Sequence, residues 1–143
     1  MVPAPVLKAW RAAGKRGVDK RKAWEKRLAA ANSATRAEFK RRIDGELPAN
    51  FGTAMLDFKK KLAADKPKMA TRKSSETVLE IINGVVPETM GGSADLTGSN
   101  NTRTSQTKPF SAADYSGRFV HYGIREHGMA GAMNGIALHG GVI

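Results

Sequence analysis

The sequence predicts an α/β fold in which a helical segment precedes a region of alternating strands and helices. Two observations support this prediction. Up to about residue 44 the chain is rich in Ala, Lys, Arg and Glu, and its apolar residues recur at helical spacing. Beyond residue 67, short runs bounded by glycine and typical of strands alternate with apolar helical runs. We therefore expect residues 1–66 to form helices and a linker, and residues 67–143 to belong to an α/β domain.

Amphipathic helices are expected before residue 44. The apolar residues that mark them at helical spacing are Leu7 with Trp10, Trp24 with Leu28 and Ala31, and Phe39 with Ile43. Gly14 and Gly17 separate the first helix from the second. Asn32-Ser33 offers an N-cap for a third helix, and Asp44-Gly45 marks its end.

The segment from Leu47 to Met69 is interpreted as a surface connection. Pro48 and Pro67 bracket it, and it carries a lysine run at 59–61. This composition suits a solvent-exposed linker, so we place a domain boundary near Pro67.

After the boundary, a helix capped by Thr71 is expected to end at Val85 or Val86, before Pro87. A short strand over residues 90–96 should then run into a polar loop over residues 97–108.

The last predicted elements are a strand and a helix. The strand covers residues 118–123, and the helix runs from about Arg125 to Leu138, with Gly140-Gly141 beyond it. Val142-Ile143 then looks like the start of another strand with no partner left to reach, which suggests a chain that is cut short.

Charge is distributed unevenly along the 143 residues, whose net charge is +11. Through Lys73 there are 20 basic and 7 acidic residues, and from Ser74 onward there are 4 and 6. The basic residues of the first half are best explained as lying on solvent-exposed faces of helices, where the aliphatic stems of Lys and Arg cover apolar surface. A nucleic-acid surface is the weaker alternative, because the aromatic residues there are not interleaved with basic ones as a stacking platform requires.

Several classes of function are excluded or disfavoured by composition. The chain has no cysteine, so it has no disulfide, thiolate metal site or cysteine nucleophile. It shows neither a secretory signal nor a long apolar run, so we expect a soluble, cytoplasmic protein that binds no membrane. Its three histidines do not form a zinc-binding pattern.

Two carboxyl groups lie where strands are expected to end. Asp95 could contact a ligand there, because ligands bind at the carboxyl ends of strands in α/β sheets, or it could simply make a turn. Glu126 lies in the densest chemical cluster, Ile124-Arg125-Glu126-His127, at the start of the last helix. It could serve chemistry, or it could only interact favourably with the helix dipole.

Three sequence runs resemble the transketolase family, in this order and at this spacing. They are Ala70-Thr71-Arg72-Lys73-Ser74-Ser75-Glu76-Thr77, Gly91-Gly92-Ser93-Ala94-Asp95-Leu96-Thr97-Gly98-Ser99-Asn100 and Tyr122-Gly123-Ile124-Arg125-Glu126-His127-Gly128-Met129. In the first half, Trp24-Glu25 and Gly45-Glu46-Leu47-Pro48 resemble the segment that joins the family's first two domains, so the resemblance covers essentially the whole chain.

The resemblance implies transfer of a two-carbon ketol unit between sugar phosphates, as in the pentose phosphate pathway and the Calvin cycle. It implies thiamine diphosphate as cofactor, Mg²⁺ or another divalent cation on its pyrophosphate, and a homodimer whose subunits share the active site. Residues 67–143 would then be the first part of a doubly wound, parallel-sheet domain that binds the cofactor's pyrimidine ring. Residues 1–66 would be the tail of the pyrophosphate domain and the linker.

The resemblance also implies roles for four residues. Glu126 matches the catalytic glutamate that hydrogen-bonds the aminopyrimidine ring and promotes deprotonation of the thiazolium carbon. Arg72 and Ser99 match positions that hold the substrate phosphate, a role that suits a guanidinium group and a hydroxyl group as hydrogen-bond donors. Asp95 matches a residue near the cofactor.

Other parts of the family's active site are absent from this sequence. The Gly-Asp-Gly motif of the metal and pyrophosphate site does not occur, because the one Asp-Gly pair is Asp44-Gly45. The chain therefore resembles a middle section of the family, and we expect it to be catalytically inactive alone. The alternative is a non-catalytic remnant, or a split-gene half, that binds a complementary transketolase subunit.

Overall fold

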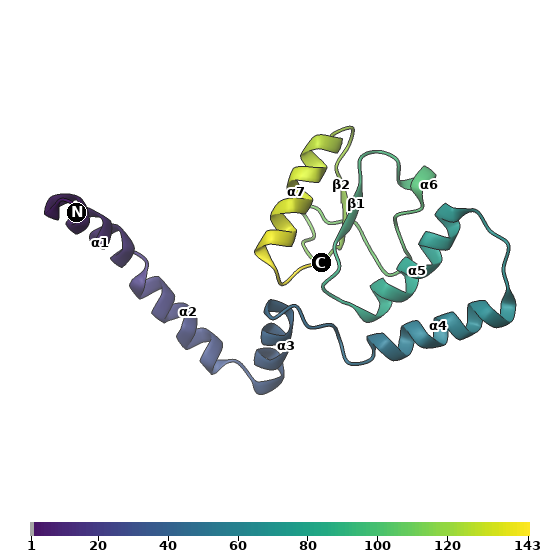
Figure 1. Cartoon of the computed structure of the whole chain (residues 1–143), viewed down its shortest axis with the longest axis horizontal. Coiled ribbons are helices and arrows are strands. Elements are labelled where there is room, and N and C mark those ends of the chain that lie inside the picture. Colours follow the sequence, from purple (N-terminus) through teal and green to yellow (C-terminus); the bar gives the residue numbers. More distant parts are fainter. Residues whose placement is uncertain (1) are drawn as a thin grey trace. The chain divides into compact units, whose positions relative to one another are not determined.

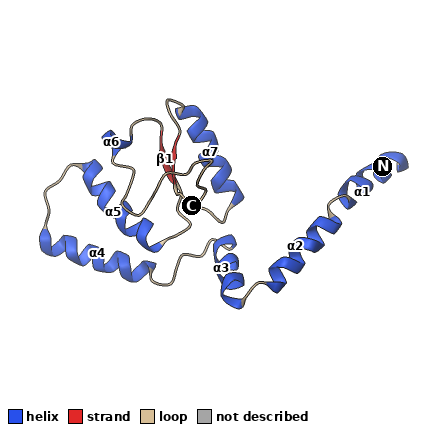
Figure 2. Ribbon diagram, turned by 180° about the vertical axis from the view of Figure 1, so that it is seen from behind, coloured by secondary structure: helices blue, strands red, loops and turns tan. Residues whose placement is uncertain are grey.

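The structure is a computed structural model that describes residues 2–143. The chain divides into two compact units, Met1–Lys40 and Arg41–Ile143, which are described separately. The first unit is helical. The second holds a small parallel sheet with helices around it (Figures 1 and 2).

Helix formation before residue 44 is confirmed. The helices are α1 (Ala4–Lys15), α2 (Val18–Ala30) and α3 (Ser33–Ile43). The predicted cap of α3 is present, because the backbone N–H of Thr35 donates to Asn32 Oδ1 at 2.8 Å. Trp24 and Phe39 meet edge to face with ring centroids 6.0 Å apart, so the apolar spacing joins α2 to α3.

Residues 47–69, which were expected to form a surface connection, contain a helix. Residues Phe51–Asp65 form α4, and one face of this helix lines a shallow pocket together with residues of α5 (Thr71–Val85). The apolar residues Phe51, Met55, Phe58 and Leu62 recur at helical spacing and are each half-buried. This pattern outweighs the two prolines and the lysine run, which lie at the ends and on the exposed side of the helix.

The α/β region contains β1 (Gly91–Ser93), α6 (Thr97–Asn100), β2 (Phe119–His121) and α7 (Glu126–His139). The expected loop after β1 therefore begins with one turn of helix. Thr71 does not cap α5, because the N-cap residue is Ala70 and no side-chain cap hydrogen bond forms there. Phe119, Val86 and Ala94 are buried and form the apolar core of this region.

The two strands pair in parallel, with Gly91 opposite Phe119, Gly92 opposite Val120 and Ser93 opposite His121. Ile143 also has a partner, contrary to expectation. Its N–H donates to the Glu88 carbonyl at 3.0 Å, and its carbonyl accepts from Met90 N–H at 2.6 Å. Met90 and Gly91 direct their N–H groups to opposite edges, so Ile143 lies on the edge of the β1 segment away from β2.

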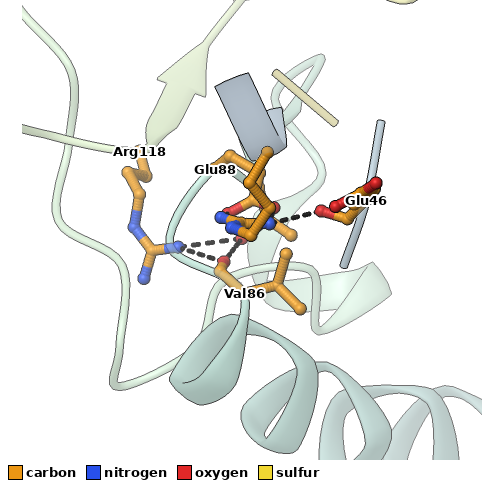
Figure 3. Close-up of polar contacts among 6 residues, drawn as sticks. Glu46, Val86, Glu88 and Arg118 are labelled. Atoms are coloured by element: carbon orange, nitrogen blue, oxygen red, sulfur yellow. Dashed lines mark hydrogen bonds and ion pairs between the residues drawn. The ribbon is translucent and has the colours of Figure 1, made fainter. Parts of the chain in front are cut away.

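Two arginines fix the segment between α5 and β1 (Figure 3). Arg41 donates to both oxygens of the buried Glu88 carboxylate, at 2.7 Å and 2.9 Å, and also to the Glu46 carbonyl. Arg118 donates to the carbonyls of Asn83 and Val86, at 2.8 Å and 3.0 Å. The two Arg118 bonds satisfy carbonyl groups that the end of α5 leaves without helical partners.

Candidate functional site at the carboxyl edge of the sheet

Because β1 and β2 are parallel, their carboxyl ends, Ser93 and His121, lie at the same edge of the sheet. The backbone N–H of Tyr122 donates to the Ser93 carbonyl at 3.0 Å and continues the pairing past β2. Asp95 follows the first strand and Glu126 follows the second. The topology therefore brings these two predicted site residues to one edge of the sheet.

The predicted phosphate ligands come from two helices near each other. Arg72 is the second residue of α5, and Ser99 lies in α6, and both side chains are exposed. Both views show α6 beside the N-terminal end of α5 (Figures 1 and 2). The loop after α6 is fastened to α5, because Asn101 Nδ2 donates to Glu76 Oε2 at 3.0 Å.

Asp95 adopts a left-handed backbone conformation, with φ of 63°. Asp tolerates this conformation better than most residues, and such residues are concentrated at functional turns. The turn is held by Ser93, whose hydroxyl group is buried and accepts from Leu96 N–H at 3.1 Å. The side chain of Asp95 is exposed at the strand end.

A tight turn delivers Glu126 to the start of α7. Gly123 has φ of 64°, and Arg125 N–H donates to the Gly123 carbonyl at 2.8 Å. Glu126 is the first residue of α7, where backbone N–H groups have no helical partner and the helix dipole favours a negative group. Ile124, two residues before Glu126, is 80% exposed, so the β2–α7 connection presents an apolar side chain to solvent.

Glu76 lies one helical turn from Arg72, and its pKa is lowered from the ordinary value. The main cause is the hydrogen bond from Lys73, and the bond from Asn101 acts in the same direction. Lys73 Nζ lies 2.6 Å from Glu76 Oε2. The charge of Lys73 is therefore paired with Glu76, whereas Arg72 projects from the same turn of α5 with its side chain exposed.

Gly92 is required by the close approach of β1 to Tyr122. A Cβ atom at Gly92 would lie 2.6 Å from Tyr122 Cε2 and 2.6 Å from the Val120 carbonyl oxygen. At the neighbouring Gly91, the nearest atom would be Phe119 Cδ2 at 4.0 Å, an ordinary contact. The two glycines therefore differ. Gly92 is needed for the close packing of β1 against Tyr122, whereas a Cβ atom at Gly91 would fit without a clash.

We predict that Gly92→Ala lowers the free energy of unfolding by about 1–3 kcal/mol, the usual cost of overpacking. Gly91→Ala is the matched control and should change it by much less. Urea unfolding followed by far-UV circular dichroism measures both. Equal effects of the two substitutions would show that the contact with Tyr122 does not determine the requirement for glycine.

Sequence reasoning missed the groups that shape this edge. In the sequence Ser93, Tyr122 and Gly123 stand out only as parts of the family motifs, although their hydrogen bonds and backbone conformation set the two turns. The sequence does indicate a tight turn at Gly123, because a glycine between a predicted strand and a predicted helix often adopts a positive φ. Nothing local in the sequence indicated the bond from Tyr122 to Ser93.

Residues 2–143 contain neither a metal-binding cluster of side chains nor a helix suited to crossing a membrane. No group of three His, Asp or Glu side chains in this part of the chain is arranged to hold a metal ion. Among the described helices, none combines the length and apolar character needed to cross a membrane.

These features define an α/β domain with a candidate ligand site at the carboxyl ends of parallel strands. The family described as "Transketolase, pyrimidine binding domain" matches residues 67–143. The chain belongs to this transketolase family.

Relatives with curated descriptions match nearly the whole chain. The transketolase of Rhodobacter capsulatus is 50% identical over 142 residues, which are 99% of this chain and 21% of the relative. The transketolase of Sinorhizobium medicae is 51% identical over 144 residues, covering 99% and 20%. The chain therefore spans about a fifth of the length of the relatives that it matches.

Solved structures agree with this assignment. The transketolase of Leishmania mexicana is 35% identical with a TM-score of 0.78, covering 100% of this chain and 21% of that one. The transketolase of Pichia stipitis in complex with sedoheptulose-7-phosphate is 38% identical with a TM-score of 0.79, covering 99% and 21%. Another structure of that enzyme contains xylulose-5-phosphate.

Proposed function

We propose that this chain is a section of a transketolase, which transfers a two-carbon ketol unit between sugar phosphates with thiamine diphosphate as cofactor. The observation that carries the proposal is the common position of Asp95 and Glu126 at the carboxyl edge of adjacent parallel strands. In the same proposal, the pyrimidine-binding domain begins near Pro67. The start of the family match at residue 67 supports this boundary.

The residues at this edge fit the pyrimidine side of thiamine diphosphate. The Glu126 carboxyl group can hydrogen-bond a ring nitrogen, and the exposed Ile124, two residues earlier in the same connection, offers an apolar side chain. When bound, thiamine diphosphate would supply a thiazolium ring that serves as the electron sink for cleavage of the sugar. Within residues 2–143 no cluster of acidic or histidine groups could hold the metal ion, so we propose that Mg²⁺ or another divalent cation binds outside this section.

Arg72 and Ser99 are proposed to hold the phosphate of the sugar substrate. An exposed guanidinium group and an exposed hydroxyl group, on helices that lie side by side, are suitable donors to phosphate oxygens. The sugar phosphates bound to the Pichia stipitis enzyme are substrates of the class proposed here. Asp95 is proposed to lie near the cofactor, which its exposed position at the end of β1 supports.

The remaining proposals concern the setting of the enzyme. We place it in the cytoplasm as a homodimer that acts in the pentose phosphate pathway. The activity would belong to an assembly larger than this section, because the chain spans only about a fifth of the length of its relatives. In this proposal the pyrimidine-binding domain contacts only one half of the cofactor, and another domain contacts the pyrophosphate half.

A chimera tests this function directly. The matching 142 residues of the Rhodobacter capsulatus transketolase are replaced by this chain, and ketol transfer is measured with thiamine diphosphate and Mg²⁺. We expect activity within about tenfold of the parent enzyme and none from the 143-residue chain alone. A folded chimera without ketol transfer would contradict the proposed function and favour a non-catalytic, partner-binding role.

A further inference from the structure

We infer that Arg125 is a positioning residue that holds Glu126 at the carboxyl edge of the sheet. The inference rests on the proposed function, because it assigns a role toward the same site. Its basis is the geometry of the turn formed by residues 122–125, called here the β2–α7 turn. In this turn one arginine bonds through both its side chain and its backbone.

The side chain of Arg125 closes the β2–α7 turn. Its Nη1 donates to the Tyr122 carbonyl at 2.8 Å, while its backbone N–H donates to the Gly123 carbonyl at 2.8 Å. Both carbonyl groups follow the last residue of β2, where the sheet no longer supplies partners. Without the guanidinium group, the Tyr122 carbonyl would lose its donor within the turn.

Gly123 makes room for this guanidinium group. A Cβ atom at Gly123 would lie 2.6 Å from Arg125 Nη1, too close for both to remain in place. Its φ of 64° also disfavours any side chain there. The glycine and the arginine are therefore complementary parts of one turn.

The β2–α7 turn is hydrogen-bonded to β1 at one end and to α7, which begins with Glu126, at the other. Tyr122 N–H donates to the Ser93 carbonyl of β1 at 3.0 Å, and its own carbonyl is the group that Arg125 holds. The Arg125 carbonyl accepts from Met129 N–H at 2.8 Å, which is the first bond of the α7 ladder. A continuous set of hydrogen bonds thus runs from β1 through Arg125 to the helix that begins with Glu126.

Lysine cannot fully replace this arginine. A guanidinium group has a planar set of donors, whereas an ammonium group is a compact charge on a flexible stem. Arg125→Lys keeps the positive charge next to Glu126 but loses the fixed geometry. The pair of substitutions Arg125→Ala and Arg125→Lys therefore separates charge from position.

A double-mutant cycle in the chimera tests the role, with two readouts. The first is the dissociation constant of thiamine diphosphate measured by calorimetry, and the second is kcat for ketol transfer. We expect Arg125→Ala and Arg125→Lys each to raise the dissociation constant about tenfold and to lower kcat by about 10- to 100-fold, because a misplacement of about 1 Å costs up to about 100-fold. In the Glu126→Gln background, the same substitutions should change the dissociation constant less than about twofold.

Arg11→Ala, which removes an exposed arginine from α1, is the matched control and should match the parent. Equal effects of the Arg125 substitutions with and without Glu126 would overturn the inference, since arginine would then act independently of that carboxyl group. If Arg125→Ala does not fold, Arg125→Lys decides by the same comparison. An inactive parent chimera that binds no cofactor would instead contradict the proposed function, so the two failures are distinguishable.

Discussion

Glu126→Ala in the chimera is expected to lower kcat by about 100- to 10,000-fold, the usual contribution of a positioned proton-transfer group. Glu126 is the first residue of α7, and its side chain is exposed at the carboxyl edge of the sheet. The role proposed for it requires an oxygen that shares a proton with the cofactor's ring nitrogen. Alanine removes that oxygen but leaves the turn and the helix, so the fold should survive.

The measurement is steady-state ketol transfer, together with the thermal unfolding midpoint of the same samples. Glu25→Ala, which removes an exposed carboxyl group from α2, is the control and should leave kcat unchanged. Glu126→Gln distinguishes charge from size, since it keeps the shape but cannot share a proton in the same way. Activity near that of the parent in both Glu126 variants would show that another group performs this step.

Periodicity and turn residues were enough to predict most helices and both strands. The apolar spacing of residues 71–85 predicted a helix, and the glycines near residue 91 predicted a short strand, and the structure confirms both. The helix α4 lies in a segment whose prolines and lysine run suggested a connection, although Phe51, Met55, Phe58 and Leu62 recur there at helical spacing. Charged residues occupy the solvent side of any surface helix, so the lysine run contained little information about secondary structure.

The candidate site was predictable only in part. Topology explains why Asp95 and Glu126 reach one edge, because residues that follow parallel strands meet there. The roles assigned to Arg72 and Ser99 came from the family resemblance and stay predictions. The bond between Arg41 and Glu88 joins residues 47 positions apart, and a long-range pair of this kind leaves no periodic signal in the sequence.

This ion pair has a consequence for stability in acid. The pKa of Glu88 is lowered from its ordinary value, mainly because Arg41 donates hydrogen bonds to the carboxylate. A carboxyl group with a lower pKa in the folded state stabilises the fold above its unfolded pKa and loses that contribution as the pH falls through the folded pKa. The Glu88 contribution should therefore be complete at neutral pH and decrease below the ordinary pKa of 4.5.

Glu88→Ala should have the largest effect on stability, lowering the free energy of unfolding by about 3 kcal/mol at neutral pH. The Glu88 side chain is 3% exposed and that of Arg41 is 16% exposed, so the substitution leaves a largely buried guanidinium group without its carboxylate. Lys61 and Asp65 form a shorter ion pair, at 2.5 Å, but their side chains are 72% and 49% exposed. Asp65→Ala is therefore the matched control, and an exposed pair of this kind contributes about 0.5 kcal/mol or less. Urea unfolding measures the loss of stability in both variants, and because the two ion pairs have similar lengths, the difference between the losses reports the effect of burial. If the two substitutions had equal effects, burial of the Arg41–Glu88 pair would not be what makes it important for the fold.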